Sequence, residues 1–317
     1  MRTSVIVPAF NEEAGIHRLL LQLTRSSDFG PDLEIIVAAN GCTDKTAEIA
    51  RSYGVAVIDL PAPSKTAALN AADELATGDV RIYLDADVPI AAGLLRQLAA
   101  AVAEPGVEAA VPRPLIDASA SSWPVRAYYA VNSRLPVFSR RLFGRGVIAI
   151  SASARGRFDA FPEITADDMF LDAIVAADEK AEIDVPVRVI APRRARHLIQ
   201  RLARARDGND EFWRFVRSAP PAYGLAVDPV PGPSAWSWLR DGVLRAAPRL
   251  LPAAVVYVSI TLLAEAKRRS PGWNVRSGWG RPASATVPAR TVSTKERVPE
   301  PRRAPAGQVD VDNRISL

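Results

Sequence analysis

The feature that most constrains the fold is a regular alternation of short apolar runs and amphipathic segments at the start of the chain. Buried strands are predicted at four runs rich in Val, Ile and Leu: residues 3–10, 33–39, 55–60 and 80–86. Helices are predicted in the three segments between them: residues 12–26, 43–54 and 65–78. Strands connected through helices of this length require right-handed crossovers. We therefore expect an α/β fold whose central sheet is mainly parallel and covered on both faces.

The pattern continues beyond the fourth strand with one interruption. Further helices and strands are predicted at residues 92–106, 107–115, 147–151, 165–178, 182–190 and 191–218. Residues 119–145 are instead rich in aromatic residues and Arg, and we expect them to lie over the ligand-binding end of the sheet. The expected organisation is an α/β domain over 1–215, a helical extension over 216–269 and a disordered basic tail over 270–317.

Composition and charge favour a globular protein without a nucleic-acid partner. Hydrophobic residues make up 48% of the 317 residues and charged residues 24%, and the net charge is +5. Residues 266–317 alone hold eleven Lys and Arg against four Asp and Glu. Because the positive charge is concentrated in this tail, the rest of the chain lacks the basic surface that coats nucleic acid.

Two segments bear on where the protein is located. The N-terminal apolar run is short and is followed by acidic residues, unlike a secretory signal, so we expect a cytoplasmic protein. Residues 250–264 are apolar apart from Ser259 and Thr261, with Arg249 before them and Lys267 shortly after. Because a spanning helix needs roughly 20 residues, two alternatives stay open: a peripheral helix on the inner face of the cell membrane, or a packed terminal helix.

Polar clusters follow three of the predicted strands. They are the segments PAFNEE, ANGCTD and DAD, after the first, second and fourth strands. Ligands of open parallel sheets bind beyond the carboxyl ends of the strands, so we expect these clusters to meet. Asp85 and Asp87 would project to one side if the strand continues through them, and two converging carboxylates favour Mg²⁺ or Mn²⁺ holding a diphosphate. The alternative is that Asp85 caps a loop and Asp87 is solvated.

Four segments in order resemble the family 2 glycosyltransferases. They are SVIVPAFNEE, EIIVAANGCTDKTAEIA, SKTAALNAADELATGDVRIYLDAD and FPEITADDMFL, within roughly residues 3–200. The resemblance implies the GT-A nucleotide-diphospho-sugar fold and an inverting, metal-dependent transfer of sugar from a nucleotide-diphosphate donor to an acceptor hydroxyl on a lipid, glycan or small metabolite.

The resemblance also implies roles for individual residues. Contacts with the nucleotide base and ribose are implied for Pro8, Ala9, Asn11 and Glu12. Lys65 would lie near the phosphates or base of the donor, while Asn70 on the same helix is open to a structural role. Asp87 would be the direct ligand of a divalent metal (Mg²⁺ or Mn²⁺), and Asp85 would hold the ribose, the metal or a metal-bound water.

The acidic doublet Asp167-Asp168 matches the acidic motif of the family, which implies that Asp168 is the catalytic base. That role has independent chemical sense, because inverting transfer needs a carboxylate opposite the leaving diphosphate to accept the proton of the acceptor hydroxyl. The alternative is helix N-capping, since acids are favoured in a first turn. We assign the base to Asp168 and the cap to Asp167.

The sequence departs from the family pattern at two places. Ala39 and Asn40 stand where acids usually bind the base, so Asn40 could still contact a base but the identity of the donor nucleotide is not indicated. Asp44 nearby fits a helix cap at least as well as a ligand. The motif of processive members is also incomplete, because Ala203 and Arg204 follow Gln200 where Arg-Trp is expected, which favours transfer of a single sugar.

Several alternatives stay open from the sequence. A nucleotidyltransferase would carry a Gly-rich, Lys- or Arg-bearing loop after the first strand, which PAFNEEAG is not. A catalytically silent sugar-nucleotide-binding or membrane scaffold protein would bind the nucleotide without turnover. His197 could complete a metal shell or be an ordinary exposed histidine. An arginine cluster could close over the diphosphate, meet anionic lipid or form a solvated helix face: Arg193, Arg194, Arg196, Arg201, Arg204 and Arg206.

Overall fold

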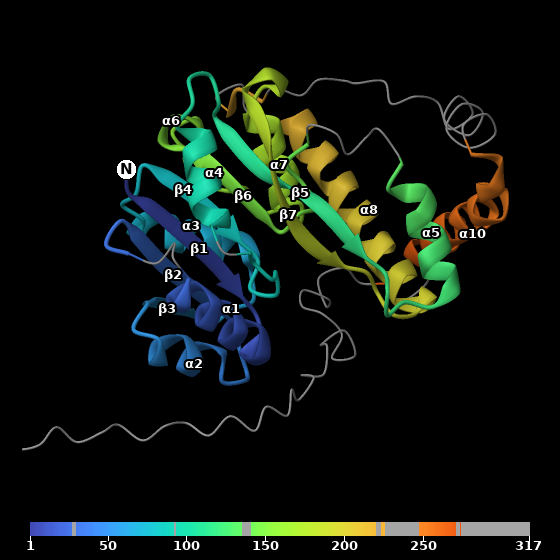
Figure 1. Cartoon of the computed structure of the whole chain (residues 1–317), viewed down its shortest axis with the longest axis horizontal. Helices are drawn as coiled ribbons and strands as arrows, with labels where there is room; N and C mark the ends of the chain where they lie inside the picture. Colours follow the sequence, from blue (N-terminus) through green and yellow to red (C-terminus); the bar gives the residue numbers. More distant parts are fainter. Residues whose placement is uncertain are drawn as a thin grey trace, which may run out of the picture. The chain divides into compact units, whose positions relative to one another are not determined.

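The structure is a computed structural model that describes residues 1–26, 30–91, 93–134, 141–219, 223–225, 247–270 and 273. All of them belong to the unit Met1–Ala285, and the remaining unit is Thr286–Leu317. The unit Met1–Ala285 contains a seven-stranded sheet in the order β3-β2-β1-β4-β6-β5-β7 (Figure 1). The strands are β1 Thr3–Ala9, β2 Leu33–Asn40, β3 Ala56–Leu60, β4 Val80–Leu84, β5 Ala109–Asp117, β6 Val147–Ser151 and β7 Lys180–Ile190.

The sheet is parallel except at β6. β1 pairs in parallel with β2 and β4, and β2 pairs in parallel with β3. β6 runs antiparallel between β4 and β5, and β7 pairs in parallel with β5. Because β6 is reversed, its first residue, Val147, lies opposite Leu84 at the carboxyl end of β4. The segment that leads into β6 is thereby brought to the edge where the parallel strands end.

Helices cover both faces of the sheet. Their bounds are α1 Glu13–Arg25, α2 Thr46–Ser52, α3 Lys65–Leu75, α4 Leu94–Val102, α5 Trp123–Asn132, α6 Ala152–Arg155, α7 Asp167–Ile174, α8 Ala195–Ser218 and α10 Leu251–Arg268. Short 3₁₀ turns occur at η2 Ala177–Glu179 and η5 Pro248–Leu250. The alternation of strand and helix predicted from the sequence is confirmed, with differences of a few residues at the ends of elements.

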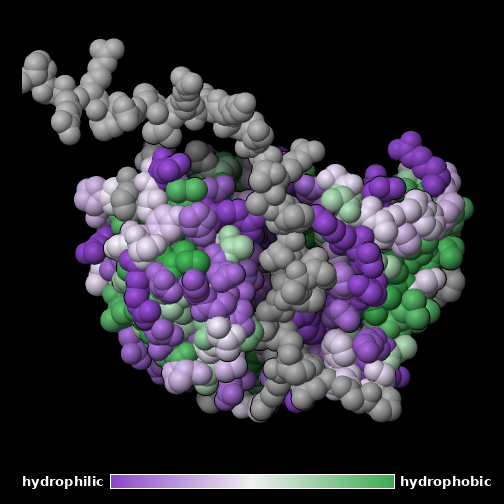
Figure 2. Space-filling view, turned by 90° about the horizontal axis from the view of Figure 1, so that it is seen from below, coloured by the Kyte–Doolittle hydropathy of each residue, from purple (hydrophilic) through white to green (hydrophobic). Residues whose placement is uncertain are grey.

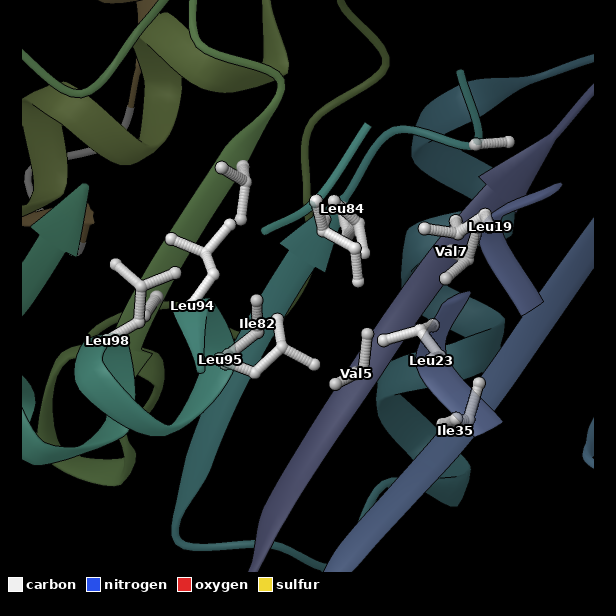
Figure 3. Packing of buried hydrophobic residues seen from close by; sticks show 14 of the residues in the cluster. Val5, Val7, Leu19, Leu23, Ile35, Ile82, Leu84, Leu94, Leu95 and Leu98 are labelled. Atoms are coloured by element: carbon white, nitrogen blue, oxygen red, sulfur yellow. The ribbon is translucent and has the colours of Figure 1, made fainter. Parts of the chain in front are cut away.

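Two hydrophobic cores lie on opposite faces of the sheet because side chains alternate along each strand. Val5 and Val7 of β1 pack on one face with α1 and α4, as Figure 3 shows for labelled residues including Leu23 and Leu95. Ile6, between the two valines, packs on the other face with residues of α3, α6, α7 and α8. Burying both faces of the strands explains why they are near-continuous apolar runs in the sequence.

The structure corrects two expectations about segments. β4 ends at Leu84, so Asp85 and Asp87 are not on an extended strand. The 119–145 segment does not lie as a whole over the ligand-binding end of the sheet. Its first half forms α5, which packs against α10, and residues 135–140 lie outside the described residues.

The expected domain boundaries remain predictions. α8 continues to Ser218, three residues past the expected boundary at 215. The helical extension contains α10, which packs against α5 and α8. The disordered tail expected over 270–317 lies outside the described residues apart from Ser270 and Trp273.

Candidate active site

Asp85 is the first residue after β4 and begins a tight turn. The Val88 N–H donates to the Asp85 carbonyl at 3.1 Å, and the Asp85 N–H donates to the Gly146 carbonyl at 2.8 Å. Ala86 is buried in this turn, and Asp87 is partly exposed. A β-turn, and not the two-residue period of a strand, therefore positions the two acids.

Lys65 joins the turn after β4 to the start of α7. Its Nζ lies 3.0 Å from Asp85 Oδ1 and 3.0 Å from Asp167 Oδ2. Lys65 is the first residue of α3, where the Ser64 hydroxyl caps the helix by accepting from the Ala67 N–H. Burial opposes the charge on Lys65, but Asp167, Asp85 and Asp168 together hold its pKa well above the ordinary value. The lysine is therefore a fixed cation among acids from two distant segments.

Asp167 and Asp168 occupy different environments at the start of α7. Asp167 is buried, and burial raises the pKa of its carboxyl to about 6, although Lys65 acts in the opposite direction. Asp168 is partly exposed, and its Oδ2 accepts from the Gly144 N–H at 3.0 Å. Burial also raises the pKa of the Asp168 carboxyl, against the effects of Lys65 and the Gly144 N–H. Of the two residues, Asp168 is the less buried.

The cap assigned to Asp167 from the sequence is wrong. Ala166 is at the N-cap position of α7, without a side-chain hydrogen bond to the helix. The Asp167 carboxylate instead pairs with Lys65. Asp167 pairs with Lys65 and does not cap α7, because a buried carboxylate is stabilised more by a full positive charge than by the partial charges of a helix end.

Asn70 clasps the segment before the acidic doublet, a structural role that the sequence left open. Its side-chain amide donates to the Phe161 carbonyl at 3.1 Å, and its Oδ1 accepts from the Phe161 N–H at 2.7 Å. Both bonds are to the backbone of Phe161, which precedes Asp167 in the chain, and Asn70 is on the same helix as Lys65. α3 therefore holds the acidic doublet at two points, through an amide clasp and through an ion pair.

The segment 141–146 is part of the site that sequence reasoning missed. Gly144 contacts Asp168 and Gly146 contacts Asp85, each through the backbone. Gly146 has φ +70°, and a Cβ added there would lie 2.5 Å from Val88 Cγ2. The segment is anchored by buried charges, since Asp172 accepts from the Leu142 N–H at 2.8 Å. The pair of glycines around Arg145 was a signal for backbone positions with positive φ.

The segment after β1 carries four predicted donor-binding residues. Pro8 and Ala9 are the last two residues of β1 and are buried. Asn11 is exposed with φ 51°, and its Oδ1 accepts from the Thr43 N–H at 2.7 Å. A Cβ added at Gly15 would lie 2.8 Å from Glu12 Oε2 and 3.1 Å from the Ala86 carbonyl oxygen. The Glu12 carboxylate and the turn after β4 therefore both lie against the first turn of α1.

Asn40 is buried, and its side-chain amide bonds within the protein. Its Nδ2 donates to the carbonyls of Ala9 and Ala38, at 3.1 and 3.2 Å, and its Oδ1 accepts from the Ser64 N–H at 3.1 Å. These bonds join the ends of β1 and β2 to the start of α3. Asn40 is fully buried and both ends of its side-chain amide are hydrogen-bonded, so contact with a base, which stays a prediction, would require these bonds to rearrange.

Asp44 has the capping role that the sequence allowed. It accepts from the backbone N–H of Thr46 at 3.0 Å and from that of Glu13 at 3.2 Å. These two N–H groups belong to the first residues of α2 and α1. One carboxylate thus satisfies the starts of two helices and fixes the loops beside the site.

Asp85 and Asp87 fit a metal site whose remaining ligands come from the diphosphate of the donor. Among the described residues, no group of three or more His, Cys, Asp or Glu side chains could hold a metal alone. Mg²⁺ is often bound by one or two carboxylates together with substrate phosphates. Asp87, with Asp85 beside it in the same turn, fits that kind of site, in which the ligand set is completed by a diphosphate.

His197 and the first arginines of the cluster lie away from these acids. Gly208 shows which part of α8 lies near the site, because a Cβ added at this glycine would lie 3.7 Å from the Cβ of Ala166. At 1.5 Å per residue, His197 is roughly 16 Å further back along the helix. This distance favours the interpretation of His197 as a surface histidine.

Comparison with known proteins identifies the family. A family model described as glycosyl transferase family 2 matches residues 4–163, about half of the chain. The chain belongs to glycosyl transferase family 2. This membership confirms the resemblance drawn from the four motifs and the expectation of a glycosyltransferase. Lys65, Asp85 and Asp87 lie inside the matched range, and Asp167 and Asp168 follow shortly after it.

Curated relatives match over a short stretch of this family 2 chain. A 4,4'-diaponeurosporenoate glycosyltransferase from Staphylococcus aureus is 40% identical over 57 residues, which are 18% of this chain and 14% of that protein. The match therefore spans about a seventh of the length of that relative.

A solved structure confirms the fold. The mannosyltransferase PcManGT from Pyrobaculum calidifontis, in complex with GDP-Man and Mn²⁺, has a TM-score of 0.54 at 23% identity, covering 84% of this chain and 77% of that one. Glucosyl-3-phosphoglycerate synthase from Mycobacterium tuberculosis has a TM-score of 0.46 at 22% identity, covering 59% of this chain and 72% of that one. The first likeness supports the GT-A architecture with its mainly parallel sheet.

Proposed function

We propose that this protein transfers a single sugar from a nucleotide-diphosphate donor to an acceptor hydroxyl, with inversion at the anomeric carbon and with a divalent metal. The oxygen of the acceptor hydroxyl forms the new bond to the anomeric carbon as the bond to the diphosphate oxygen breaks. The hydroxyl proton goes to the carboxylate of Asp168. The products are the glycosylated acceptor and a nucleoside diphosphate.

The observation that carries the proposal is the bridge made by Lys65. Its Nζ is 3.0 Å from Asp85, which lies in the D-x-D turn, and 3.0 Å from Asp167, which adjoins Asp168. Inverting transfer needs a leaving-group site and a base on opposite sides of one sugar. The bridge brings the turn that would hold the leaving diphosphate to the acid that would accept the proton.

The environment of Asp168 suits a general base. The residue is partly exposed, and burial raises the pKa of its carboxyl above the ordinary value. A base with a raised pKa accepts a proton more readily than an ordinary carboxylate. Asp167 is committed to Lys65 and holds the start of α7, so it is a positioning residue in this proposal.

A divalent metal, when bound, would neutralise the charge that develops on the leaving diphosphate. Asp87 and Asp85 would hold it, while Pro8, Ala9, Asn11 and Glu12 would line the donor base and ribose. The fold neighbour PcManGT is described in complex with GDP-Man and Mn²⁺, which supports testing that metal first. The acceptor is proposed only as a hydroxyl compound: a lipid, a glycan or a small metabolite.

The test is release of nucleoside diphosphate from a panel of nucleotide sugars, with and without Mn²⁺. The proposal predicts release from at least one donor, an acceptor-dependent increase, and loss of release on chelation. Binding of a nucleotide sugar without release, over the whole panel and with mixed lipid and soluble acceptors, would instead identify a silent sugar-nucleotide-binding protein.

A further inference from the structure

Helix α10 has a buried face and an exposed face of different character. Ala254, Ile260 and Ala264 are buried, and α10 packs against α5 and α8. From Leu251 to Ala266 every exposed residue is uncharged: Leu251, Pro252, Val255, Val258, Ser259, Leu262, Leu263 and Ala266. Val255 is 66% exposed and Leu262 64% exposed. Figure 2 shows hydrophobic surface at the side of the molecule where α5 and α10 lie in Figure 1.

The helix is long and apolar enough to span a membrane, but its contacts favour a position on the surface. Among the described residues, Pro248–Arg268 is the one helix of such length and composition, and 17% of its most apolar window is buried. Arg206 of α8 donates to the Thr261 carbonyl at 2.9 Å, in the middle of α10. A helix whose one face packs on an arginine-bearing helix cannot be surrounded by lipid. An exposed apolar face on such a helix suits insertion in the plane of the interface.

Exposed arginines that pair with no described acid lie on or beside α5, α8 and α10. α5 contains no acidic residue, the first acid in α8 is Asp207, and α10 contains only Glu265. Seven arginines on or beside the three helices are exposed: Arg126, Arg134, Arg193, Arg194, Arg196, Arg201 and Arg249. No carboxylate within the described ranges pairs with any of them, whereas arginines elsewhere, such as Arg157, form ion pairs.

Contacts between α5 and α10 bring an arginine to the start of α10. α5 runs antiparallel to α10, since Tyr128 stacks on Tyr257 and Val131 packs with Ala254, so the end of α5, with Arg134, lies near Leu251. Arg249 lies just before α10 in the chain. The start of α8 lies instead beside the start of α5, since the Ser122 N–H donates to the Arg193 carbonyl at 2.8 Å.

The same geometry argues against a role of these arginines at the donor diphosphate. Gly208 of α8 lies against Thr165 and Ala166, beside the acidic doublet. Arg196 is about 18 Å back along α8 from Gly208. The first members of the arginine cluster are therefore placed away from Asp168.

We propose that α10 docks this protein on an anionic lipid bilayer, with its exposed apolar face in the interface and with Arg134 and Arg249, beside the start of the helix, on lipid phosphates. Apolar burial and attraction to anionic headgroups act together at such a surface. The guanidinium group pairs well with phosphate. The proposal concerns a surface distant from the catalytic acids and does not depend on the proposed sugar transfer.

The test is co-sedimentation of the full chain with vesicles of phosphatidylcholine alone and of phosphatidylcholine with phosphatidylglycerol. We expect at least about tenfold stronger binding to the anionic vesicles, weakened by high salt because exposed charges are screened. No binding to either vesicle, or equal binding to both, would overturn the proposal.

Substitutions on α10 and elsewhere test whether α10 is the surface that binds the vesicles. Val255→Asp combined with Leu262→Asp should reduce vesicle binding about tenfold or more, whereas Leu75→Asp, at an exposed leucine of α3, should not. Arg249→Ser combined with Arg134→Ser should weaken binding to anionic vesicles only. All variants should keep the melting temperature and the nucleoside-diphosphate release of the wild type, so failure here is distinguishable from failure of the proposed function.

Sedimentation equilibrium tests the alternative that a second copy of the chain, and not a membrane, covers the exposed face of α10. If the wild type is a dimer that does not bind vesicles, and the double aspartate variant is a monomer, the face is an interface between copies of the chain and the lipid proposal is wrong. A wild type whose vesicle binding is unaffected by the double aspartate variant would also contradict it.

Discussion

The ammonium group of Lys65 lies 3.0 Å from the carboxylate of Asp167, joining the first residue of α3 to the first residue of α7. The same nitrogen lies 3.0 Å from Asp85. One cation therefore sets the spacing between the turn after β4 and the acidic doublet. The site depends on this contact for its geometry before any ligand arrives.

Asp168→Asn should reduce sugar transfer about a hundredfold or more, because a positioned general base contributes at least that factor. Donor binding should be retained, since Asp168 is proposed to act on the acceptor hydroxyl. Initial rates of nucleoside-diphosphate release and calorimetric donor binding measure the two effects separately. Asp178→Asn, at an exposed acid in η2, is the matched control. Transfer at the wild-type rate in Asp168→Asn would show that the base assignment is wrong.

Lys65→Met should lower the free energy of unfolding by about 3 kcal/mol, because it leaves the buried Asp167 carboxylate without its cation. Lys65→Arg keeps the charge and should lose less. Urea denaturation of both variants measures the difference, with Lys45→Met as control because Lys45 is at an exposed loop position. Equal stability of Lys65→Met and wild type would mean that the bridge is not formed in solution.

Asp167 should make stability fall with rising pH between about pH 4 and pH 6. Burial raises its pKa from 3.8 to about 6, so in this window the native state holds a proton that the unfolded chain has released. Asp167→Asn does not titrate, so its free energy of unfolding should increase relative to wild type across the window. Urea denaturation at several pH values checks this. A relative decrease would mean that Lys65 lowers the pKa below the ordinary value.

Asn70→Ala should destabilise the fold by about 1–3 kcal/mol, because it removes both partners of the Phe161 backbone groups. It should also lower the rate of transfer, since the segment leading to Asp168 loses one of its two attachments to α3. Thermal denaturation and release assays measure these effects. Asn209→Ala, at an exposed position of α8, should change neither. An unchanged rate in Asn70→Ala would limit the clasp to a stabilising role.

Mn²⁺ and a nucleoside diphosphate should raise the melting temperature more together than the sum of their separate effects, because the proposed metal site includes diphosphate oxygens. Asp87→Asn should remove most of this extra stabilisation, whereas Asp184→Asn, whose side chain is 99% exposed, should not. Differential scanning fluorimetry with and without chelator is the measurement. Strong stabilisation by Mn²⁺ alone would point to a metal site made by the protein only.

The order of strands and helices was predictable because it depends on local patterns. Apolar residues of β1 such as Val5 and Ile6 are buried on opposite faces, so the strand reads as a continuous apolar run. The position of Asp85 at the carboxyl edge of the sheet followed from the same alternation. The end of β4 was placed too late, because an Asp85–Val88 hydrogen bond closes a turn that the apolar pattern does not encode.

The sequence by itself determined the α/β architecture, the edge at which the acids gather and the family, since these depend on periodicity and on residue types at fixed spacing. Only the tertiary structure decided that Asp167 pairs with Lys65, that Asn70 holds Phe161, and that the segment before the reversed strand β6 donates to Asp168. These contacts join segments far apart in the chain. Their formation depends on how whole elements pack, which no local pattern specifies.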